Sequence, residues 1–190
     1  MNVDLTARQL AAAGVHYAPQ IASAAARHGI DARLLAAVAA QETGGPGSNG
    51  GRNVVGDGGH GRGLFQIDDR WHQFARSPGA MDPAANADYA AGMLHELIGR
   101  YGNVRQALSA YNAGSPHAAG TQTDWPDGRR LDYADSVLRH YADLCGHAAP
   151  AVAPPISIQP QLPIPSQPQS YRRQETDYAG LFDSDDSITE

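Results

Sequence analysis

A single glutamate has the position that acid catalysis requires. Leu35, Val38 and Ala39 are spaced as one face of a helix, and Glu42 continues that face. Desolvation at the edge of a core and the negative end of the helix dipole both raise the pKa of a carboxyl placed there. Such a carboxyl keeps its proton near neutral pH and can act as a general acid. The plainer interpretation, that Glu42 turns outward at a fraying helix end, is favoured by helix geometry alone.

Two further carboxyls lie in the glycine-rich stretch GDGGHGRGLFQIDD, residues 56–69, which contains five glycines. Asp57 and Asp68 occur at its two ends. Glycosidases pair two carboxyls about 5–5.5 Å apart when they retain configuration, and about 6.5–9.5 Å apart when they invert it. A glycine-rich hairpin opposite a helix end could meet either spacing. The alternative is that both aspartates are turn formers bonded to their own backbone.

The elements that must position these carboxyls are mostly helices. Asp caps, early prolines and terminal glycines predict five of them, at residues 17–29, 31–45, 82–102, 103–114 and 129–146. Short strands are expected only at 52–55 and 63–67. We therefore expect a mainly α, lysozyme-like α+β fold with a small β-hairpin beside a substrate cleft.

Several other site classes fit the sequence poorly. The segment GDGGHG matches a dinucleotide-binding pattern, but no long helix follows it and Asp57 would repel phosphate. A zinc site from His60, His72, Asp57 and Asp68 lacks a supporting motif, and no metal or other cofactor is expected. All 14 basic residues are arginine and the net charge is −6, which argues against a nucleic-acid partner.

The composition changes near the end of the sequence. Residues 1–148 form the expected catalytic domain, 149–170 a proline-rich linker and 171–190 an acidic, disordered tail. The first residues resemble no signal peptide, and no apolar run approaches the ~18 residues of a membrane span. Cys145, the single cysteine, leaves the redox compartment undecided.

Four motifs in a fixed order carry a family resemblance. They are Glu42-Thr43, Gly63-Leu64-Phe65-Gln66, the AYNAG turn at 110–114, and Asp132-Tyr133-Ala134 followed by Val137. Together they resemble the goose-type lysozyme and lytic transglycosylase (SLT-like) superfamily over residues from about Tyr17 to Leu144. Asp57, Asp68 and His72 occupy places where goose-type muramidases carry equivalent residues. Thr43 and Phe65 stand where serine and methionine are commoner.

The resemblance implies roles for individual residues. Glu42 would protonate the glycosidic oxygen, and Asp57 or Asp68 would activate or position a water. Glycines would let the loop backbone lie against a flat polysaccharide, opposite Glu42. The substrate-binding residues would be Thr43, Phe65, Gln66, His72, Tyr111, Asn112 and Tyr133.

Three functions remain open at this point. The preferred one is a muramidase that hydrolyses the β-1,4 bond from N-acetylmuramic acid to N-acetylglucosamine in peptidoglycan. The alternative is a lytic transglycosylase, which needs no second carboxylate because the 6-hydroxyl of the sugar attacks instead and leaves 1,6-anhydro ends. The third is a wall-binding or assembly protein that has lost the reaction.

Delivery follows from the expected substrate. A wall enzyme without a recognisable signal peptide would be made in the cytoplasm and act in the periplasm or cell wall. A phage lysis system, a virion or a specialised secretion machine would carry it there. The tail is a candidate contact for such a phage or secretion component, although a solubilising tail is the plainer interpretation. We expect a monomer.

Overall fold

The expected helices at 17–29, 82–102 and 103–114 begin and end within one residue of the predicted bounds. The helix expected at 129–146 begins only at Tyr133, because residues 130 and 131 form a strand, and the helix at Val3–Ala12 was not expected. The structure, a computed structural model, describes residues 2–146, so the expected linker and tail lie outside the described residues. Side-chain oxygens of Asn2, Asp31, Asp82, Asn103 and Asp132 each accept a backbone N–H in the first turn of a helix. The α-helices are α1 (Val3–Ala12), α2 (Ala18–His28), α3 (Ala32–Ala39), α4 (Pro83–Tyr101), α5 (Val104–Ala113) and α6 (Tyr133–Leu144).

The expected helix at 31–45 changes its character before it ends. The α-helical part, α3, stops at Ala39, and η1 (Ala40–Gly44) is one turn of π-helix. Its wider hydrogen bonding is visible at the end, where the Gly45 N–H donates to the carbonyl of Ala40 at 2.9 Å. Isolated π turns are rare and often occur at functional sites. Glu42 lies in the middle of this turn.

A small antiparallel sheet follows, in the order β1-β2-β3. Its strands are β1 (Val54–Gly56), β2 (Gly61–Gly63) and β3 (Ile67–Asp68), with η2 (Asp57–Gly59) between the first two. The prediction of one strand across 63–67 was wrong, because 64–66 form a turn. Gln66 has a φ of 48° there, and its side-chain amide donates to the carbonyl of Gly63 at 2.8 Å, which closes the turn.

A second hairpin was not expected from the sequence. It consists of β4 (Thr123–Asp124) and β5 (Arg130–Leu131), paired antiparallel just before α6. The 3-10 turns η3 (Gln73–Arg76) and η4 (Pro78–Met81) connect β3 to α4. The fold is thus mainly helical with two small antiparallel sheets, which confirms the expected fold class.

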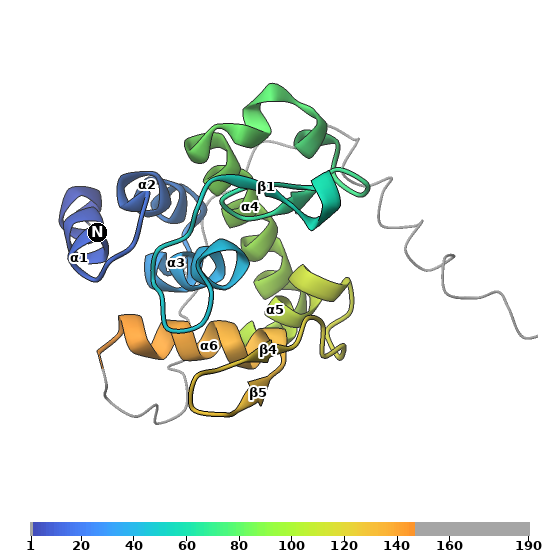
Figure 1. Cartoon of the computed structure of the whole chain (residues 1–190). Coiled ribbons are helices and arrows are strands. Elements are labelled where there is room, and N and C mark those ends of the chain that lie inside the picture. Colours follow the sequence, from blue (N-terminus) through green and yellow to red (C-terminus); the bar gives the residue numbers. More distant parts are fainter. Residues whose placement is uncertain (1, 147–190) are drawn as a thin grey trace, which may run out of the picture. The chain divides into compact units, whose positions relative to one another are not determined.

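The core surrounds α3. Every residue from Leu34 to Ala40 is at most 1% exposed, because α3 packs against both α2 and α6. Figure 1 shows α3 between the β1 hairpin and α6. The π turn that carries Glu42 continues directly from this buried helix. In the described part of the chain, no helix is both long and apolar enough to cross a membrane.

Candidate active site

Glu42 is held by a tyrosine from the far end of the domain. The hydroxyl of Tyr133, the first residue of α6, donates to Oε1 of Glu42 at 2.6 Å. Burial raises the pKa of Glu42 from 4.5 to about 7, and the Tyr133 hydrogen bond opposes this rise. The carboxyl is therefore about half protonated at neutral pH, as a general acid requires.

A second tyrosine links this pair to the glycine-rich segment. The ring of Tyr111 stacks on that of Tyr133, with 6.4 Å between the ring centroids and 16° between the planes. Its hydroxyl donates to the carbonyl of Phe65 at 3.2 Å. All four predicted motifs are therefore connected, because Tyr133 contacts Glu42 and Tyr111 contacts both Tyr133 and Phe65. Burial and the nearby Glu42 also raise the pKa of Tyr133 well above its usual value, so its hydroxyl stays a hydrogen-bond donor.

Thr43 and Phe65 are buried beside this group. The Thr43 hydroxyl lies 3.1 Å from the carbonyl of Leu64 and accepts the Arg52 backbone N–H at 2.8 Å. Phe65 is 1% exposed. These contacts join the π turn to the turn at 64–66, and they are structural. Direct substrate binding by the two side chains stays a prediction.

Three of the five loop glycines are needed for packing, while Gly58 and Gly59 have open space around them. Contact of the loop backbone with a polysaccharide stays a prediction. A Cβ on Gly56 or Gly61 would lie 2.2 or 2.4 Å from Oε1 of Gln66. The amide nitrogen of Gln66 donates to Gly63 and, at 3.1 Å, to Val54. Gln66 therefore braces the hairpin from within. Its predicted contact with substrate remains untested.

Asn86 supports the same hairpin from below. It is fully buried on α4, accepts the backbone N–H of Phe65 at 2.9 Å and donates to the carbonyls of Arg62 and Ala80. A Cβ on Gly63 would lie 2.6 Å from its amide nitrogen. No sequence motif includes Asn86. Its position on the apolar face of α4, however, predicts a buried polar side chain that needs hydrogen-bond partners.

Asp57 and Asp68 converge on one arginine. Arg70 forms ion pairs with both carboxylates through its Nη2, and its backbone N–H donates to Asp68 at 2.7 Å. These contacts overcome the partial burial of Asp68 and lower its pKa, so that this carboxylate is ionised. Arg70 thus brings Asp57 and Asp68 together, while their predicted position opposite Glu42 stays a prediction. Their catalytic role stays a prediction.

The remaining predicted residues have local partners. A ring nitrogen of His72 lies 3.1 Å from the hydroxyl of Tyr89, and burial lowers the pKa of His72, so the ring is neutral at pH 7. Asn112 accepts the backbone N–H of Thr121 at 2.8 Å and so fixes the loop that leads to β4. Substrate contacts of His72 and Asn112 stay predictions.

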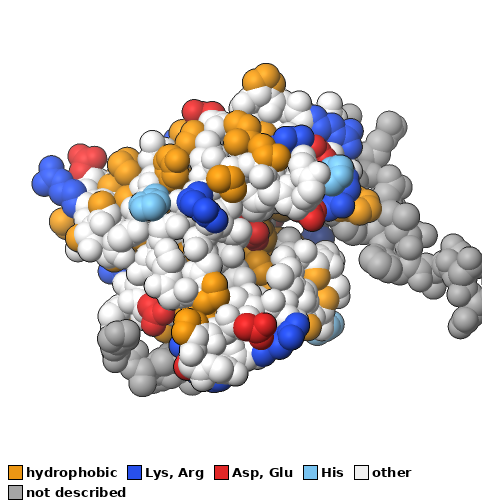
Figure 2. Space-filling model, in the orientation of Figure 1, with side chains coloured by type: hydrophobic (Ala, Val, Ile, Leu, Met, Phe, Trp, Pro, Cys, Tyr) orange, Lys and Arg blue, Asp and Glu red, His pale blue; other side chains and the backbone are white. Residues whose placement is uncertain are grey.

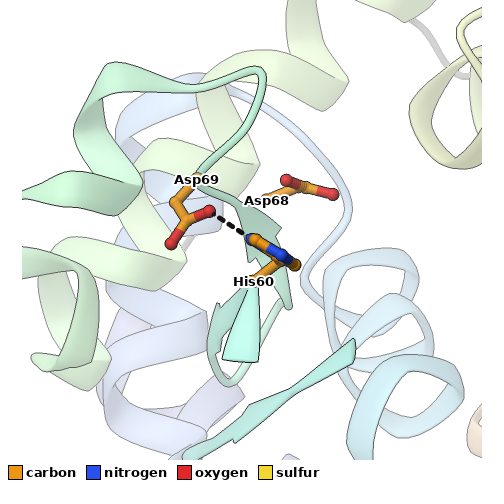
Figure 3. A group of neighbouring side chains, drawn as sticks. All are labelled: His60, Asp68 and Asp69. Atoms are coloured by element: carbon orange, nitrogen blue, oxygen red, sulfur yellow. Dashed lines mark hydrogen bonds and ion pairs between the residues drawn. The ribbon is translucent and has the colours of Figure 1, made fainter. Parts of the chain in front are cut away.

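One group of side chains has the composition of a metal site. Ligand atoms of His60, Asp68 and Asp69 lie within 4.8 Å of one another, and Figure 3 shows His60 bonded to Asp69. That bond is 2.8 Å long, and Arg62 pairs with the other oxygen of Asp69 at 2.8 Å. Because Arg62 and Arg70 already neutralise these carboxylates, the group acts as an ion-pair network of the hairpin.

The space-filling view agrees with a cleft at this place. Figure 2 shows a hollow between the region of the β1–β3 sheet and that of the β4–β5 hairpin, with acidic and apolar side chains at its base. The elements that carry Glu42, Tyr111 and Tyr133 meet between those two regions. A polymeric substrate could lie along such a groove.

Comparison with known proteins decides the family. The model of the transglycosylase SLT domain matches residues 19–125. The chain belongs to this family. The SLT match confirms the resemblance inferred from the four motifs, and it covers both Glu42 and the AYNAG turn. It also supports the expected enzyme class, the peptidoglycan-cleaving enzymes.

Curated relatives are similar over much of the described region. A transglycosylase of Enterobacteria phage PRD1 is 31% identical over 141 residues, which cover 74% of this chain and 48% of the relative. Protein IpgF of Shigella flexneri is 31% identical over 121 residues, covering 60% of this chain and 74% of the relative. The SLT chain thus spans about half the length of the phage relative. The description of the family and the name of the phage relative favour transglycosylation, the alternative, over the muramidase reaction preferred from the sequence.

Proposed function

We propose that this SLT domain is a lytic transglycosylase that cleaves the β-1,4 bond between N-acetylmuramic acid and N-acetylglucosamine in peptidoglycan. The observation that carries the proposal is the partly buried Glu42, with its raised pKa and its hydrogen bond from Tyr133. One such carboxyl can give and then take back a proton in a single catalytic cycle.

The reaction balances with this one carboxyl. Glu42 donates its proton to the glycosidic oxygen as the bond from that oxygen to C1 of the muramic acid breaks. The 6-hydroxyl of the same sugar then attacks C1, and its proton passes to the Glu42 carboxylate. The products are a 1,6-anhydromuramic end and a free 4-hydroxyl, no water is consumed, and Glu42 is ready for another cycle.

Tyr133 supports both halves of this cycle. Its hydroxyl donates to Oε1, which leaves the other oxygen of Glu42 to carry the transferred proton. The same bond stabilises the carboxylate after the proton has left, and so limits the rise in pKa caused by burial.

Hydrolysis is the second candidate because Asp57 and Asp68 are both present. In the described structure Arg70 binds both carboxylates, and it lowers the pKa of Asp68 against the effect of partial burial, which makes this carboxylate a weaker general base. Transglycosylation needs neither aspartate. This is the physical reason for preferring it.

The experiment is a product analysis with purified peptidoglycan. We expect soluble fragments with 1,6-anhydro ends, identified by mass spectrometry because they lack the added mass of one water. Fragments that carry reducing ends and that mass would establish hydrolysis instead.

Glu42→Gln is the matched variant for the proposed acid. It keeps the size of the side chain and a hydrogen-bond acceptor for Tyr133, but it has no transferable proton. We expect activity to fall by at least about 10²-fold with the fold retained. Lysis at a near-normal rate by this variant would disprove the assignment, and a wild-type protein that only binds the wall would support the inactive, wall-binding alternative.

Delivery of such an enzyme stays a separate proposal. Its substrate lies in the cell wall, so the protein must reach the wall from the place of its synthesis. We retain the predicted phage or secretion route, with a contact in the tail, as the hypothesis that explains this. Release of the full chain from cells, compared with that of a chain ending at residue 148, is the measurement that addresses it.

A further inference from the structure

The π turn requires more support than the bond from Tyr133 provides. A π turn is less favourable than an α-helical one, so contacts outside it must hold its extra residue in place. In an α-helix each residue turns the side-chain direction by about 100°. A shift of the turn by one residue would therefore point the Glu42 carboxyl away from Tyr133.

Three consecutive side chains of the turn each bond to a different partner. The Glu42 carboxyl accepts a hydrogen bond from the Tyr133 hydroxyl. The Thr43 hydroxyl donates to the carbonyl of Leu64 and accepts the backbone N–H of Arg52. The remaining one is Gln41.

Gln41 lies at the middle of a chain of hydrogen bonds. Its side-chain carbonyl accepts from the hydroxyl of Ser136 at 2.5 Å, and its amide nitrogen donates to the hydroxyl of Thr123 at 2.8 Å. Ser136 in turn accepts the indole N–H of Trp125 at 3.0 Å. Gln41 thus uses both ends of its amide, and it ties the π turn to α6 and to β4.

Two members of this hydrogen-bond chain are buried, so each of them depends on its partner within the protein. Ser136 is 0% exposed and Trp125 is 4% exposed, so a missing partner would leave a buried polar atom without a hydrogen bond, which destabilises the fold. Arg139 lies over the Trp125 ring, with 4.0 Å between its guanidinium carbon and the ring centroid. The indole is therefore fixed on two sides.

The spacing on α6 joins this chain to the acid. Tyr133 and Ser136 are three residues apart, and so they are neighbours on one face of the helix. They bond to Glu42 and Gln41, which are consecutive in the π turn. One face of α6 therefore holds two successive residues of the turn.

We propose that Gln41 is a positioning residue for Glu42, and that the hydrogen-bond chain Thr123–Gln41–Ser136–Trp125 fixes the π turn so that the acid faces its substrate. This inference rests on the proposed role of Glu42. It assigns to Gln41 and Ser136 an effect on turnover that acts through Glu42, with no contact to substrate.

The test compares kinetics on soluble glycan strands freed of their peptides. Gln41→Met keeps the length of the side chain and removes both of its hydrogen bonds, and Ser136→Ala removes the bond from α6. We expect each variant to lower kcat by about 10-fold or more, because small misplacements of a catalytic group are costly. KM should stay within about twofold of the wild-type value, since neither residue touches substrate.

Two matched variants separate positioning from general stability. Tyr141→Phe removes a different bond of α6, the 3.0 Å bond from Tyr141 to Asp31, away from the π turn. Thr123→Val removes the last hydroxyl of the chain at almost constant volume, and Thr123→Ser keeps it. We expect Tyr141→Phe and Thr123→Ser to retain wild-type kcat and Thr123→Val to lower it several-fold.

Each outcome has one meaning. If Gln41→Met, Ser136→Ala and Thr123→Val all turn over like Tyr141→Phe, at matched folded fractions by circular dichroism, the positioning role is wrong. A rise in KM at unchanged kcat would also overturn it, since that indicates lost substrate binding. If the wild-type protein cleaves no glycan at all, the proposed function fails, and this result is distinct from the other two.

Discussion

At the scale of single residues, the chemistry depends on the protonation of Glu42. Desolvation raises its pKa to about 7, and the hydrogen bond from the Tyr133 hydroxyl opposes this rise. The balance leaves a group that can both donate and accept a proton close to neutral pH. A fully exposed glutamate, with a pKa of about 4.3, would almost never carry the proton there.

The pH dependence of activity follows from this pKa. The free enzyme needs protonated Glu42, so kcat/KM should decline as the pH rises through about 7. Initial rates on glycan strands between pH 5 and pH 9 would measure this. A rate that keeps rising to pH 9 would contradict the role of Glu42 as the acid.

Stability should depend on the same carboxyl. Because its pKa is raised from 4.5 to about 7 on folding, the folded chain binds more protons than the unfolded chain between these values. The free energy of unfolding should therefore fall as the pH rises through this window, by roughly 3 kcal/mol from this group. Chemical denaturation at several pH values should show a flatter dependence for Glu42→Gln, and equal slopes would rule the contribution out.

Tyr133 can be tested by removing one atom. Tyr133→Phe keeps the ring that stacks on Tyr111 but leaves Oε1 of Glu42 without its donor. The pKa of Glu42 should rise further, since this bond lowers it, and kcat should fall about 10-fold. Tyr111→Phe is the matched control, because Tyr111 bonds to a backbone carbonyl. An unchanged pH profile in Tyr133→Phe would argue against the coupling.

At the scale of elements, the glycine-rich hairpin is shaped by what lies inside it. Gln66 and Asn86 occupy the space that side chains at positions 56, 61 and 63 would need. The glycines are thus a consequence of two amides that satisfy the backbone of the β1–β3 sheet. The hairpin in turn places the Phe65 carbonyl where Tyr111 reaches it.

This packing predicts the effect of one added methyl group. Gly61→Ala would bring a Cβ to 2.4 Å from Gln66 Oε1, and we expect it to destabilise the protein by about 1–3 kcal/mol. In a protein that already carries Gln66→Ala, the same change should lower the free energy of unfolding by clearly less, because the Gln66 side-chain oxygen that the new Cβ would meet is absent. Thermal or denaturant unfolding of the four proteins in the cycle measures this. Strictly additive losses would show that the two sites do not interact.

At the scale of the whole molecule, the site joins segments that are far apart in the sequence. Glu42 and Tyr133 are separated by 91 positions and Phe65 and Tyr111 by 46, and they meet because α3, α5 and α6 pack together. All these segments lie within residues 2–146. A chain ending at residue 148 should therefore retain the activity of the full chain on purified peptidoglycan. A large loss would show that the removed residues contribute to the reaction.

The sequence by itself located most of the helices and singled out Glu42 as the candidate acid. Capping residues and glycines are local signals, and they marked the starts and ends of the principal helices because each acts within one turn. Glu42 could be found since it ends an apolar stripe, and the four ordered motifs supplied the family. All of this information is short in range.

Only the tertiary structure decided how the acid is held and what surrounds it. The π turn, the bond from Tyr133 and the chain through Gln41 and Ser136 depend on contacts across 82 to 95 positions, which no local pattern encodes. Arg70 lies only two positions from Asp68 and 13 from Asp57, yet its pairing with both carboxylates was found only in the structure. The periodicity of a sequence shows which side chains share one face of a helix. Packing decides which atoms of those side chains meet. The direction of the partly buried Glu42 carboxyl is set by such packing, so the sequence alone could not give it.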